Sequence, residues 1–497
     1  MSLPPLRQRP SRTQGRDLTK GEVPSSITEN RGQQRLSICQ VKIKGIFKKG
    51  LRPAAVTAYL AVAMLVVSAG TAQADPGDNP GKLTTITSSS ELAKLQLVEH
   101  RVPTASLDNL ASEMGTSRGV DQVLASANHP MRNAANCDST ETAALPVKPT
   151  AESAYCWDTG DAVTQDWLPQ SVTSSGDADN DGVWGTNKVI LSGWGQNGTT
   201  TTDHMGRIAF IDANDPNNLK YRWVLPVIPL NGGTDYRALK SHMGGMVWYQ
   251  DKLIVTSWEK DSDNNVMYIF DMKRILQATV NSSAVGKVSG GWSADGYQYV
   301  MPAVGSYSLA GGACSSTNDD SLPCFGSISL DRSSVPDSLV ATEWFSSGGT
   351  EPARIWRYDF GSDPGYLATD SSSHVNASAA YETNAVGLQG VLSHSATSGG
   401  TPNFYVDDAR GGVGQHGILW RQNASGATAA ANCGQDITYA CWGQHTESMS
   451  YWWSTGRVWT LTEWAADSAG HWTGTDTAIP QRVLFSVPLS SIDSSLS

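Results

Sequence analysis

Two histidines stand at matching positions of a repeated motif. His242 opens the segment His-Met-Gly-Gly-Met-Val-Trp, and His445 opens His-Thr-Glu-Ser-Met-Ser-Tyr, in which Glu447 is the third residue. Imidazoles at equivalent positions of a repeat can hold a metal ion or move protons on a substrate. Only two of the five recognisable copies carry histidine, and packing against nearby tryptophans is the favoured explanation of the pattern. The catalytic and the structural interpretation therefore both stay open.

Carboxylates beside tryptophans indicate a second chemistry. Glu463 directly precedes Trp464, and Glu447 lies in a matching copy of the motif. Glycosidases act through a pair of acidic residues, and an indole can stack on a sugar ring. The catalytic alternative is thus a polysaccharide lyase or glycosidase that uses His242, His445, Glu447 and Glu463. Signatures of serine hydrolases, zinc proteases, P-loops and dinucleotide sites do not occur in the sequence.

Calcium is the only cofactor that a motif suggests. Asp177, Asp179 and Asp181 are spaced as in the first half of a calcium-binding loop. The glutamate that would close such a loop is absent, because Lys188 stands at that position. A plain turn rich in aspartate and glycine explains the segment equally well.

The surroundings of the motif predict the elements that position these residues. Each copy consists of a small-residue entry, a first strand, a polar turn and a second strand that ends near tryptophan. Short strands between Gly, Asn, Asp and Ser turns are typical of an all-β protein, and this order is that of a β-propeller blade. At about 40–50 residues per blade, residues 155–497 provide about seven blades. Seven blades are preferred, six are possible, and a β-sandwich is the alternative.

A propeller would gather distant residues around one opening. The residues before each inner strand and those after each second strand lie at the same face of such a ring. The first group contains His242, Gln389, His445 and Glu447, and the second contains Trp194, Asp203, His204, Trp258, Glu259, Asp407, Asp408, Arg410, Glu463 and Trp464.

The first 74 residues have the order of a secretory leader with an N-terminal extension. Basic residues between Lys42 and Arg52 precede an apolar run from Ala54 to Val67, and Ala-Gln-Ala follows at 72–74. This is the pattern of a signal peptide that is cut after Ala74. The apolar run is shorter than the ~20 residues that span a bilayer. We expect a secreted, extracellular protein without a membrane anchor.

The composition changes near residue 150. No Phe, Tyr or Trp occurs from residue 75 to residue 154, whereas all 17 tryptophans lie after Tyr155. Large aromatic side chains dominate core burial. The sequence therefore predicts a removable pro-segment or flexible arm over 75–150 and a propeller over 155–497.

The charge distribution excludes one class of partner. Residues 1–74 hold 12 of the 36 basic residues and 3 of the 47 acidic ones, which leaves 24 basic and 44 acidic residues beyond the leader. So acidic a protein cannot neutralise phosphates, and binding to nucleic acid is ruled out. We expect a monomer.

Six cysteines remain once the leader, which contains Cys39, is removed. An even number in a secreted chain is typical of full pairing. No clustered Cys and His spacing favours a metal site. Pairing between neighbours in the sequence predicts the disulfides Cys137–Cys156, Cys314–Cys324 and Cys433–Cys441.

The leader, the cysteines and three motif copies resemble a group of secreted actinobacterial propeller proteins. The copies are Gln389-Gly390-Val391 and the segments that His242 and His445 open, and the resemblance covers about 155–497. It implies a seven-bladed propeller that is not an enzyme. Such a protein engages a secreted neutral metalloprotease of the dispase or thermolysin type and promotes the autolysis of that protease. It also serves as a glutamine-donor substrate of transglutaminase.

Transglutaminase needs a glutamine on accessible, flexible backbone. Gln196, in a Gly-, Asn- and Thr-rich segment, and Gln435, between Cys433 and Cys441, fit this description best, and Gln422 and Gln481 come next. Each of them is also explained as an ordinary solvated loop amide.

Overall fold

The computed structural model describes residues 78–496 except 198–203, 258–262, 316–320, 346–351, 410–413, 434–437 and 467–477. The predicted leader lies outside the described residues. The described chain contains 29 strands and seven α-helices, so the expected all-β class is confirmed. No helix in these described ranges is long and apolar enough to cross a membrane.

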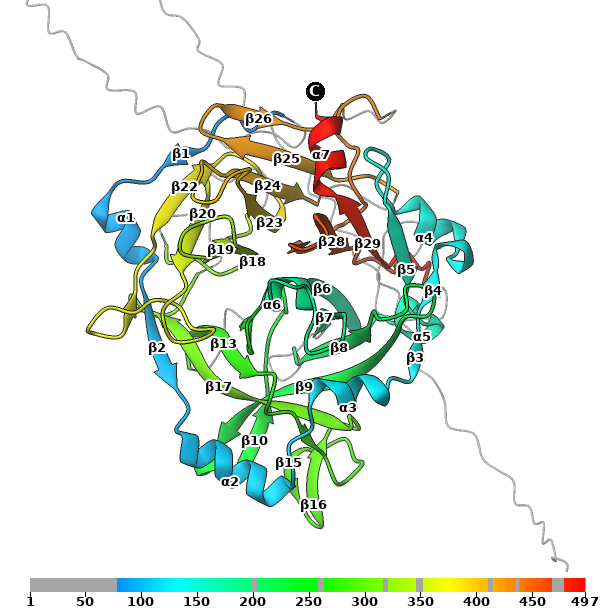
Figure 1. Ribbon diagram of the computed structural model, residues 1–497, viewed down its shortest axis with the longest axis vertical. Helices are drawn as coiled ribbons and strands as arrows, with labels where there is room; N and C mark the ends of the chain where they lie inside the picture. Colours follow the sequence, from blue (N-terminus) through cyan, green and yellow to red (C-terminus); the bar gives the residue numbers. More distant parts are fainter. Residues whose placement is uncertain are drawn as a thin grey trace, which may run out of the picture. The chain divides into compact units, whose positions relative to one another are not determined.

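Five antiparallel four-stranded units, called sheets below, follow one another along the chain and surround a common centre (Figure 1). A parallel pairing between the last strand of the first unit and the last strand of the second joins these two into one continuous sheet. Their first strands are β6, β11, β18, β23 and β27, of which β6, β18 and β23 are seen nearest the centre in Figure 1. These first strands contact one another: β6 contacts β11 and β27, and β18 contacts β11, β23 and β27. The first sheet contains β6 (Trp167–Ser174), β7 (Val189–Gln196), β8 (Gly206–Asp212) and β9 (Lys220–Leu230), and the second contains β11 (Met246–Tyr249), β12 (Lys252–Thr256), β13 (Asn265–Asp271) and β17 (Tyr299–Leu309). The third contains β18 (Ser327–Asp331), β19 (Ser338–Thr342), β20 (Ala353–Asp359) and β22 (Ala379–Thr383), and the fourth contains β23 (Leu388–His394), β24 (Asn403–Asp408), β25 (Ile418–Asn423) and β26 (Gly426–Thr428).

The fifth sheet joins the two ends of the described chain. Its strands β27 (Ser450–Trp452), β28 (Arg457–Leu461) and β29 (Val483–Pro488) come last in the sequence, and β5 (Ser153–Cys156) completes the sheet by pairing with β29. Because a strand from before the first sheet closes the last one, hydrogen bonds link the beginning and the end of the series of sheets.

The described residues form five four-stranded units around the centre, so the expected number of seven or six blades is not confirmed. Four of the five motif copies do begin a sheet. The copy at 289–293 instead belongs to β16 (Gly291–Ala294), which forms a separate two-stranded sheet with β15 (Val285–Val288). The third sheet begins at Ser327, where no histidine or double glycine marks the entry.

Residues 78–150 run along the outer edges of the sheets (Figure 1, blue to cyan). Four short strands of this segment each add to a different sheet, and its leucines and valines pack in the core, with Leu95, Leu97 and Leu110 fully buried. The segment thus differs from a loosely docked arm. Its strands are β1 (Thr84–Thr85), which pairs with β22; β2 (Leu97–Arg101), with β17; β3 (His129–Pro130), with β9; and β4 (Arg132–Asn133), with β5.

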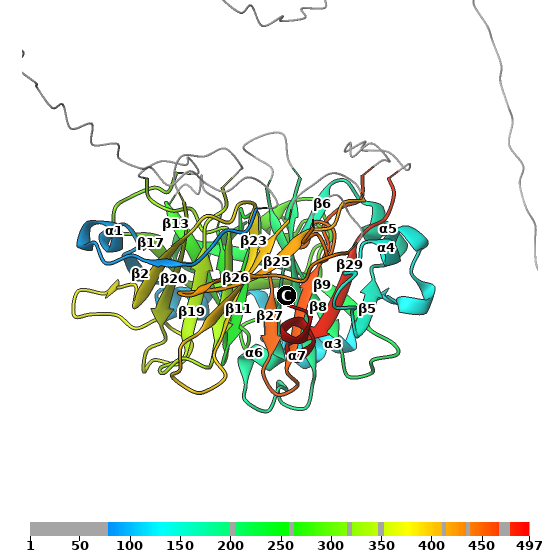
Figure 2. The ribbon, with the colours of Figure 1, turned by 90° about the horizontal axis from the view of Figure 1, so that it is seen from above.

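Short helices and hairpins connect these elements. In the side view, α6 lies at the lower face of the sheets, at the end of β6 (Figure 2). The remaining elements are α1 (Ser89–Lys94), α2 (Thr104–Met114), α3 (Val120–Ala125), η1 (Ala134–Asn136), α4 (Ser139–Ala143), α5 (Thr159–Val163), α6 (Ser175–Ala178), η2 (Asn231–Gly233), β10 (Asp235–Ala238), β14 (Leu276–Gln277), β21 (His374–Val375) and α7 (Leu489–Ser495).

The three predicted disulfides are confirmed. The structure pairs Cys137 with Cys156, Cys314 with Cys324, and Cys433 with Cys441. Disulfides persist in oxidising surroundings, so this pairing indicates an extracellular type of environment.

Candidate functional site

A cavity of about 520 Å³ opens among the ends of strands from all five sheets. Its volume lies in the range of small-molecule sites. Four of the predicted mouth residues line it together: His204, His242, Gln389 and Glu463. The prediction that these distant residues meet at one opening is confirmed for these four.

These residues lie together because each stands at the end of a strand. His204 precedes β8, His242 precedes β11, and Glu463 follows β28, so each stands where a strand reaches the same face. The backbone N–H of Ser241 donates to the carbonyl of His204 at 2.8 Å, which holds the two histidine segments side by side.

Other predicted residues lie outside the cavity lining. His445 stacks on Trp464, with ring centroids 3.5 Å apart, which supports the packing interpretation of this histidine. Glu447 is only 1% exposed, and Trp194 is buried in the core. Asp203, Trp258, Glu259 and Arg410 lie outside the described residues.

Both carboxylates of the cavity wall have internal hydrogen-bond donors. Glu343, which follows β19, accepts from Arg354 at 2.6 Å (Nε) and 2.9 Å (Nη2). Glu463 accepts from Gln170 Nε2 at 2.7 Å and from Trp464 Nε1 at 3.1 Å. Burial raises the pKa of both carboxyl groups, and these donors oppose the rise. Each carboxylate is held in place and retains acceptor positions for a ligand.

Trp344 adds an aromatic wall. Its side chain lines the cavity beside Glu343 and is 46% exposed, and no other aromatic residue in the described ranges is among the exposed large hydrophobic ones. Sequence reasoning missed Trp344 and Glu343, because they belong to the third sheet, whose entry carries no motif. The sequence did offer one signal for this sheet, because polar and aliphatic residues alternate from Ser327 to Asp331 before a polar turn, as in a strand.

The three aspartates of the candidate calcium loop have separate roles. Asp177, in α6, is buried, and its Oδ2 accepts from the hydroxyls of Thr173 (2.8 Å) and Ser450 (2.7 Å). Asp179 and Asp181 are exposed and accept from backbone N–H groups of their own turn. Among the described residues these carboxylates do not form a metal-binding group. The turn interpretation therefore replaces the calcium loop.

Asp177 gives a pH dependence that can be measured. Burial raises its pKa to about 6, above the ~3.9 of an unfolded chain. The folded state then binds the proton more tightly than the unfolded chain does. Protonated Asp177 therefore stabilises the fold fully below pH ~4, and this stabilisation is lost as the pH rises through about 6. Two pKa units correspond to ~3 kcal/mol of unfolding free energy. We expect chemical denaturation between pH 4 and 7 to show a loss of unfolding free energy that is larger in the wild type than in Asp177→Asn by about this amount. Parallel pH profiles of the two proteins would contradict this assignment.

Two of the predicted transglutaminase glutamines are buried, which corrects their description as accessible amides. Gln422 lies on β25, donates to the carbonyl of Gly81 at 3.0 Å and accepts from Thr383 at 2.8 Å. Gln481 is also buried. Gln196 is half-buried at the end of β7, and Gln435 lies outside the described residues.

The sequence matches no protein-family model and no curated protein.

Proposed function

We propose that the described domain is a secreted, five-bladed β-propeller that binds a short oligosaccharide in its central cavity. The radial order of the five sheets and the closure of the last sheet by β5 support the propeller. The leader-like sequence over 1–74 and the three disulfides support secretion.

The exposed indole of Trp344, which lines the cavity together with several polar side chains, carries the ligand proposal. A sugar presents an apolar ring face, which an indole can cover, and a rim of hydroxyls, which need hydrogen-bond partners. Glu343 stands beside the indole, and His204, His242 and Gln389 line the same space. A concave, largely apolar site with a few polar groups that orient the ligand is typical of small-molecule recognition.

The hydrogen bonding and burial of the carboxylates favour sugar binding over sugar cleavage. A glycosidase needs two carboxyl groups that flank the bond and exchange protons with the substrate. Glu343 is held by Arg354, and Glu447 is buried away from the cavity lining. The lyase or glycosidase alternative, with His242, His445, Glu447 and Glu463, therefore takes second place to a sugar-binding protein.

Removal of the indole should weaken sugar binding selectively. We expect Trp344→Ala to lose at least ~10-fold in affinity for the best oligosaccharide of a soluble panel, because ~1.4 kcal/mol of stacking and burial corresponds to that factor. Isothermal titration calorimetry measures the affinity. Val335→Ala is the matched control, since Val335 is 73% exposed and does not line the cavity. Equal affinity of Trp344→Ala and the wild type, or no binding across the panel, would contradict the proposal.

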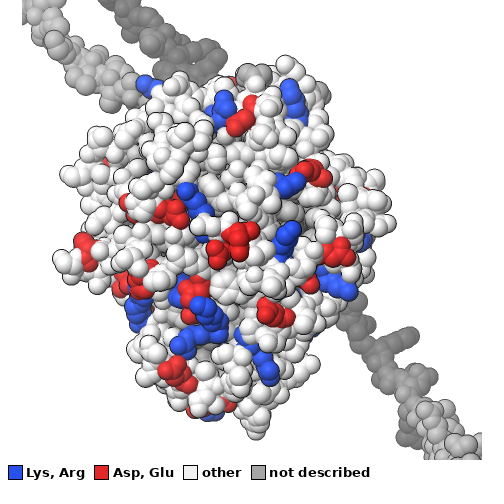
Figure 3. Space-filling view, in the orientation of Figure 1, with Lys and Arg blue, Asp and Glu red and all other residues white. Residues whose placement is uncertain are grey.

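Engagement of a secreted neutral metalloprotease is a second proposal, and it comes from the resemblance described above. The observation that favours it is the closure of the chain by three disulfides and by β5, which suits a protein that acts beside a protease. The acidic and basic side chains are interspersed on the face drawn in Figure 3, so charge alone does not single out a docking patch there.

A direct incubation tests the protease proposal. We expect an equimolar amount of the purified protein to accelerate the self-fragmentation of a thermolysin-type protease, followed by gel electrophoresis and residual activity. An unchanged lifetime of the protease would contradict the proposal. Incubation with transglutaminase and an amine probe, followed by peptide mapping, should label Gln196 or Gln435 and leave Gln422 and Gln481 unlabelled.

A further inference from the structure

Two buried carboxylates near the centre of the molecule have no ionic partner. Glu447, just before β27, is 1% exposed, and neither of its carboxylate oxygens has a hydrogen-bond partner among the described residues. Asp407, on β24, is fully buried; its Oδ1 accepts from the Thr446 hydroxyl at 2.9 Å, and its Oδ2 has no partner. Four other buried carboxylates are paired with arginine: Glu141 with Arg132, Glu343 with Arg354, Asp161 with Arg207, and Asp331 with Arg357. Asp177 instead accepts from two hydroxyl groups.

A glycine brings these two residues to one place. Gly390 on β23 lies opposite Asp407 in the fourth sheet. A Cβ atom at position 390 would lie 3.2 Å from the Asp407 Cβ and 3.0 Å from the backbone oxygen of Glu447. The absence of a side chain at Gly390 therefore lets the fourth and fifth sheets approach. The charges of Asp407 and Glu463 add to burial in raising the pKa of Glu447, as expected for neighbouring carboxylates.

A third sheet contributes an unpartnered amide oxygen. Gln170, on β6, is fully buried, and its Nε2 donates to Glu463 at 2.7 Å, which places its amide beside that carboxylate. The Oε1 of the same amide has no partner in the described chain. Unpartnered oxygen atoms from the first, fourth and fifth sheets therefore belong to one buried group, since Asp407 and Glu463 act on the charge of Glu447 and Gln170 donates to Glu463.

The local charge is not balanced. Arg482 donates its Nε to the backbone oxygen of Glu463 at 2.7 Å, and its positive charge acts on that carboxylate. In the described part of the chain, no lysine, arginine or histidine forms an ion pair with Glu447 or Asp407. Two unpaired buried charges cost several kcal/mol each, unless protons or a cation neutralise them.

We propose that Glu447, Asp407 and the amide oxygen of Gln170 bind a calcium ion. An all-oxygen donor set with two carboxylates selects a hard divalent cation over zinc or copper. Calcium tolerates irregular geometry and mixed carboxylate and amide ligands, whereas magnesium demands a near-ideal octahedron. The ion joins three sheets at the centre, so it stabilises the ring independently of any sugar in the cavity.

The test compares the chelated full-length secreted protein with and without calcium. After treatment with EDTA and gel filtration, we expect added CaCl₂ to raise Tm and to bind with a stoichiometry of one in isothermal titration calorimetry. Terbium should show tryptophan-sensitised emission that calcium displaces. MgCl₂ at the same concentration should give a smaller shift in Tm.

Two variants separate the ion from protonated acids. Glu447→Gln keeps the shape of the side chain and removes the charge, so we expect at least a 100-fold loss of calcium affinity and no calcium-dependent shift in Tm. Asp177→Asn, a buried carboxylate at the far end of β6, should keep the wild-type response. If Glu447→Gln does not fold, elemental analysis and terbium titration of the wild type still decide. A wild-type Tm that does not respond to calcium, together with no bound metal, would overturn the proposal and leave protons as the neutralising species.

Discussion

A chain that begins at Tyr155 is expected not to fold, although every tryptophan of the protein lies beyond that point. The missing segment buries Leu95, Leu97, Leu110 and Val123 completely. A fully buried aliphatic side chain contributes about 1.5–3 kcal/mol, so these four supply on the order of 6–12 kcal/mol. That amount is comparable to the whole stability of a typical domain, ~5–15 kcal/mol. The truncation also exposes the outer edges of the sheets, which promotes aggregation.

Expression of two secreted chains checks this expectation. A chain from Asp75 should give a monomer with a cooperative thermal transition, and one from Tyr155 should give aggregate or no secreted protein. A chain from Tyr155 that melts cooperatively within a few degrees of the longer chain would contradict it, and would restore the interpretation of 75–150 as a loosely attached arm. Proteolytic removal of the pro-segment remains a prediction, and fragments that stay bound after a cut would be compatible with the fold.

The composition break near residue 150 misled the prediction of this segment for a physical reason. Aromatic side chains fill the space between the sheets, but an outer strand needs only small aliphatic groups on one face. Leu97 on β2 meets this need, as do Leu107 and Leu110 on α2, which lie one turn apart on the buried side of that helix. Their spacing was present in the sequence, whereas the sheets that they cover were not deducible from it.

The site was predictable where a motif marked a strand end and not elsewhere. His242 and Gln389 stand at entries with recognisable motifs and do line the cavity. The third sheet enters through Gly326 and Ser327, small residues without a distinctive neighbour, so its cavity residues were missed. The prediction that Gln422 is accessible failed for a different reason. Gln422 lies two residues after Trp420 on the same strand, so both side chains point to the same, buried face.

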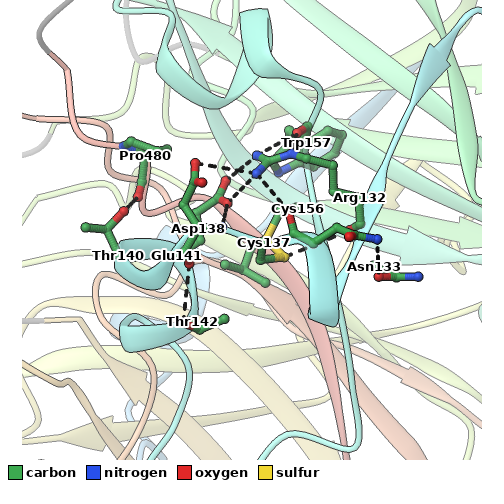
Figure 4. Close-up of a disulfide and its surroundings, with 12 residues drawn as sticks. Arg132, Asn133, Cys137, Asp138, Thr140, Glu141, Thr142, Cys156, Trp157 and Pro480 are labelled. Atoms are coloured by element: carbon green, nitrogen blue, oxygen red, sulfur yellow. Dashed lines mark hydrogen bonds and ion pairs between the residues drawn. A yellow bond between two sulfur atoms is a disulfide. The ribbon is translucent and has the colours of Figure 1, made fainter.

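We expect the largest loss of unfolding free energy from a single substitution at the ion pair between Arg132 and Glu141. Arg132, on β4, donates from Nη1 and Nη2 to the two carboxylate oxygens of Glu141 at 2.8 and 2.7 Å, and Glu141 is fully buried (Figure 4). The same guanidinium donates to the carbonyl of Trp157 at 3.0 Å. We expect Arg132→Met to lower the unfolding free energy by about 3–5 kcal/mol, because it leaves a buried carboxylate without its partner.

Chemical denaturation of a small set of variants isolates the cause. Arg132→Met/Glu141→Leu removes both charges and should be more stable than Arg132→Met alone. Arg457→Met is the matched control, since Arg457 pairs with Glu152 at the surface, where loss of the pair costs about 0–1 kcal/mol. All these variants keep the disulfide Cys137–Cys156, so the covalent anchor of this region is constant. Equal losses in Arg132→Met and Arg457→Met would mean that the disulfide alone holds the segment, whereas the expected difference assigns that role to the buried charge pair.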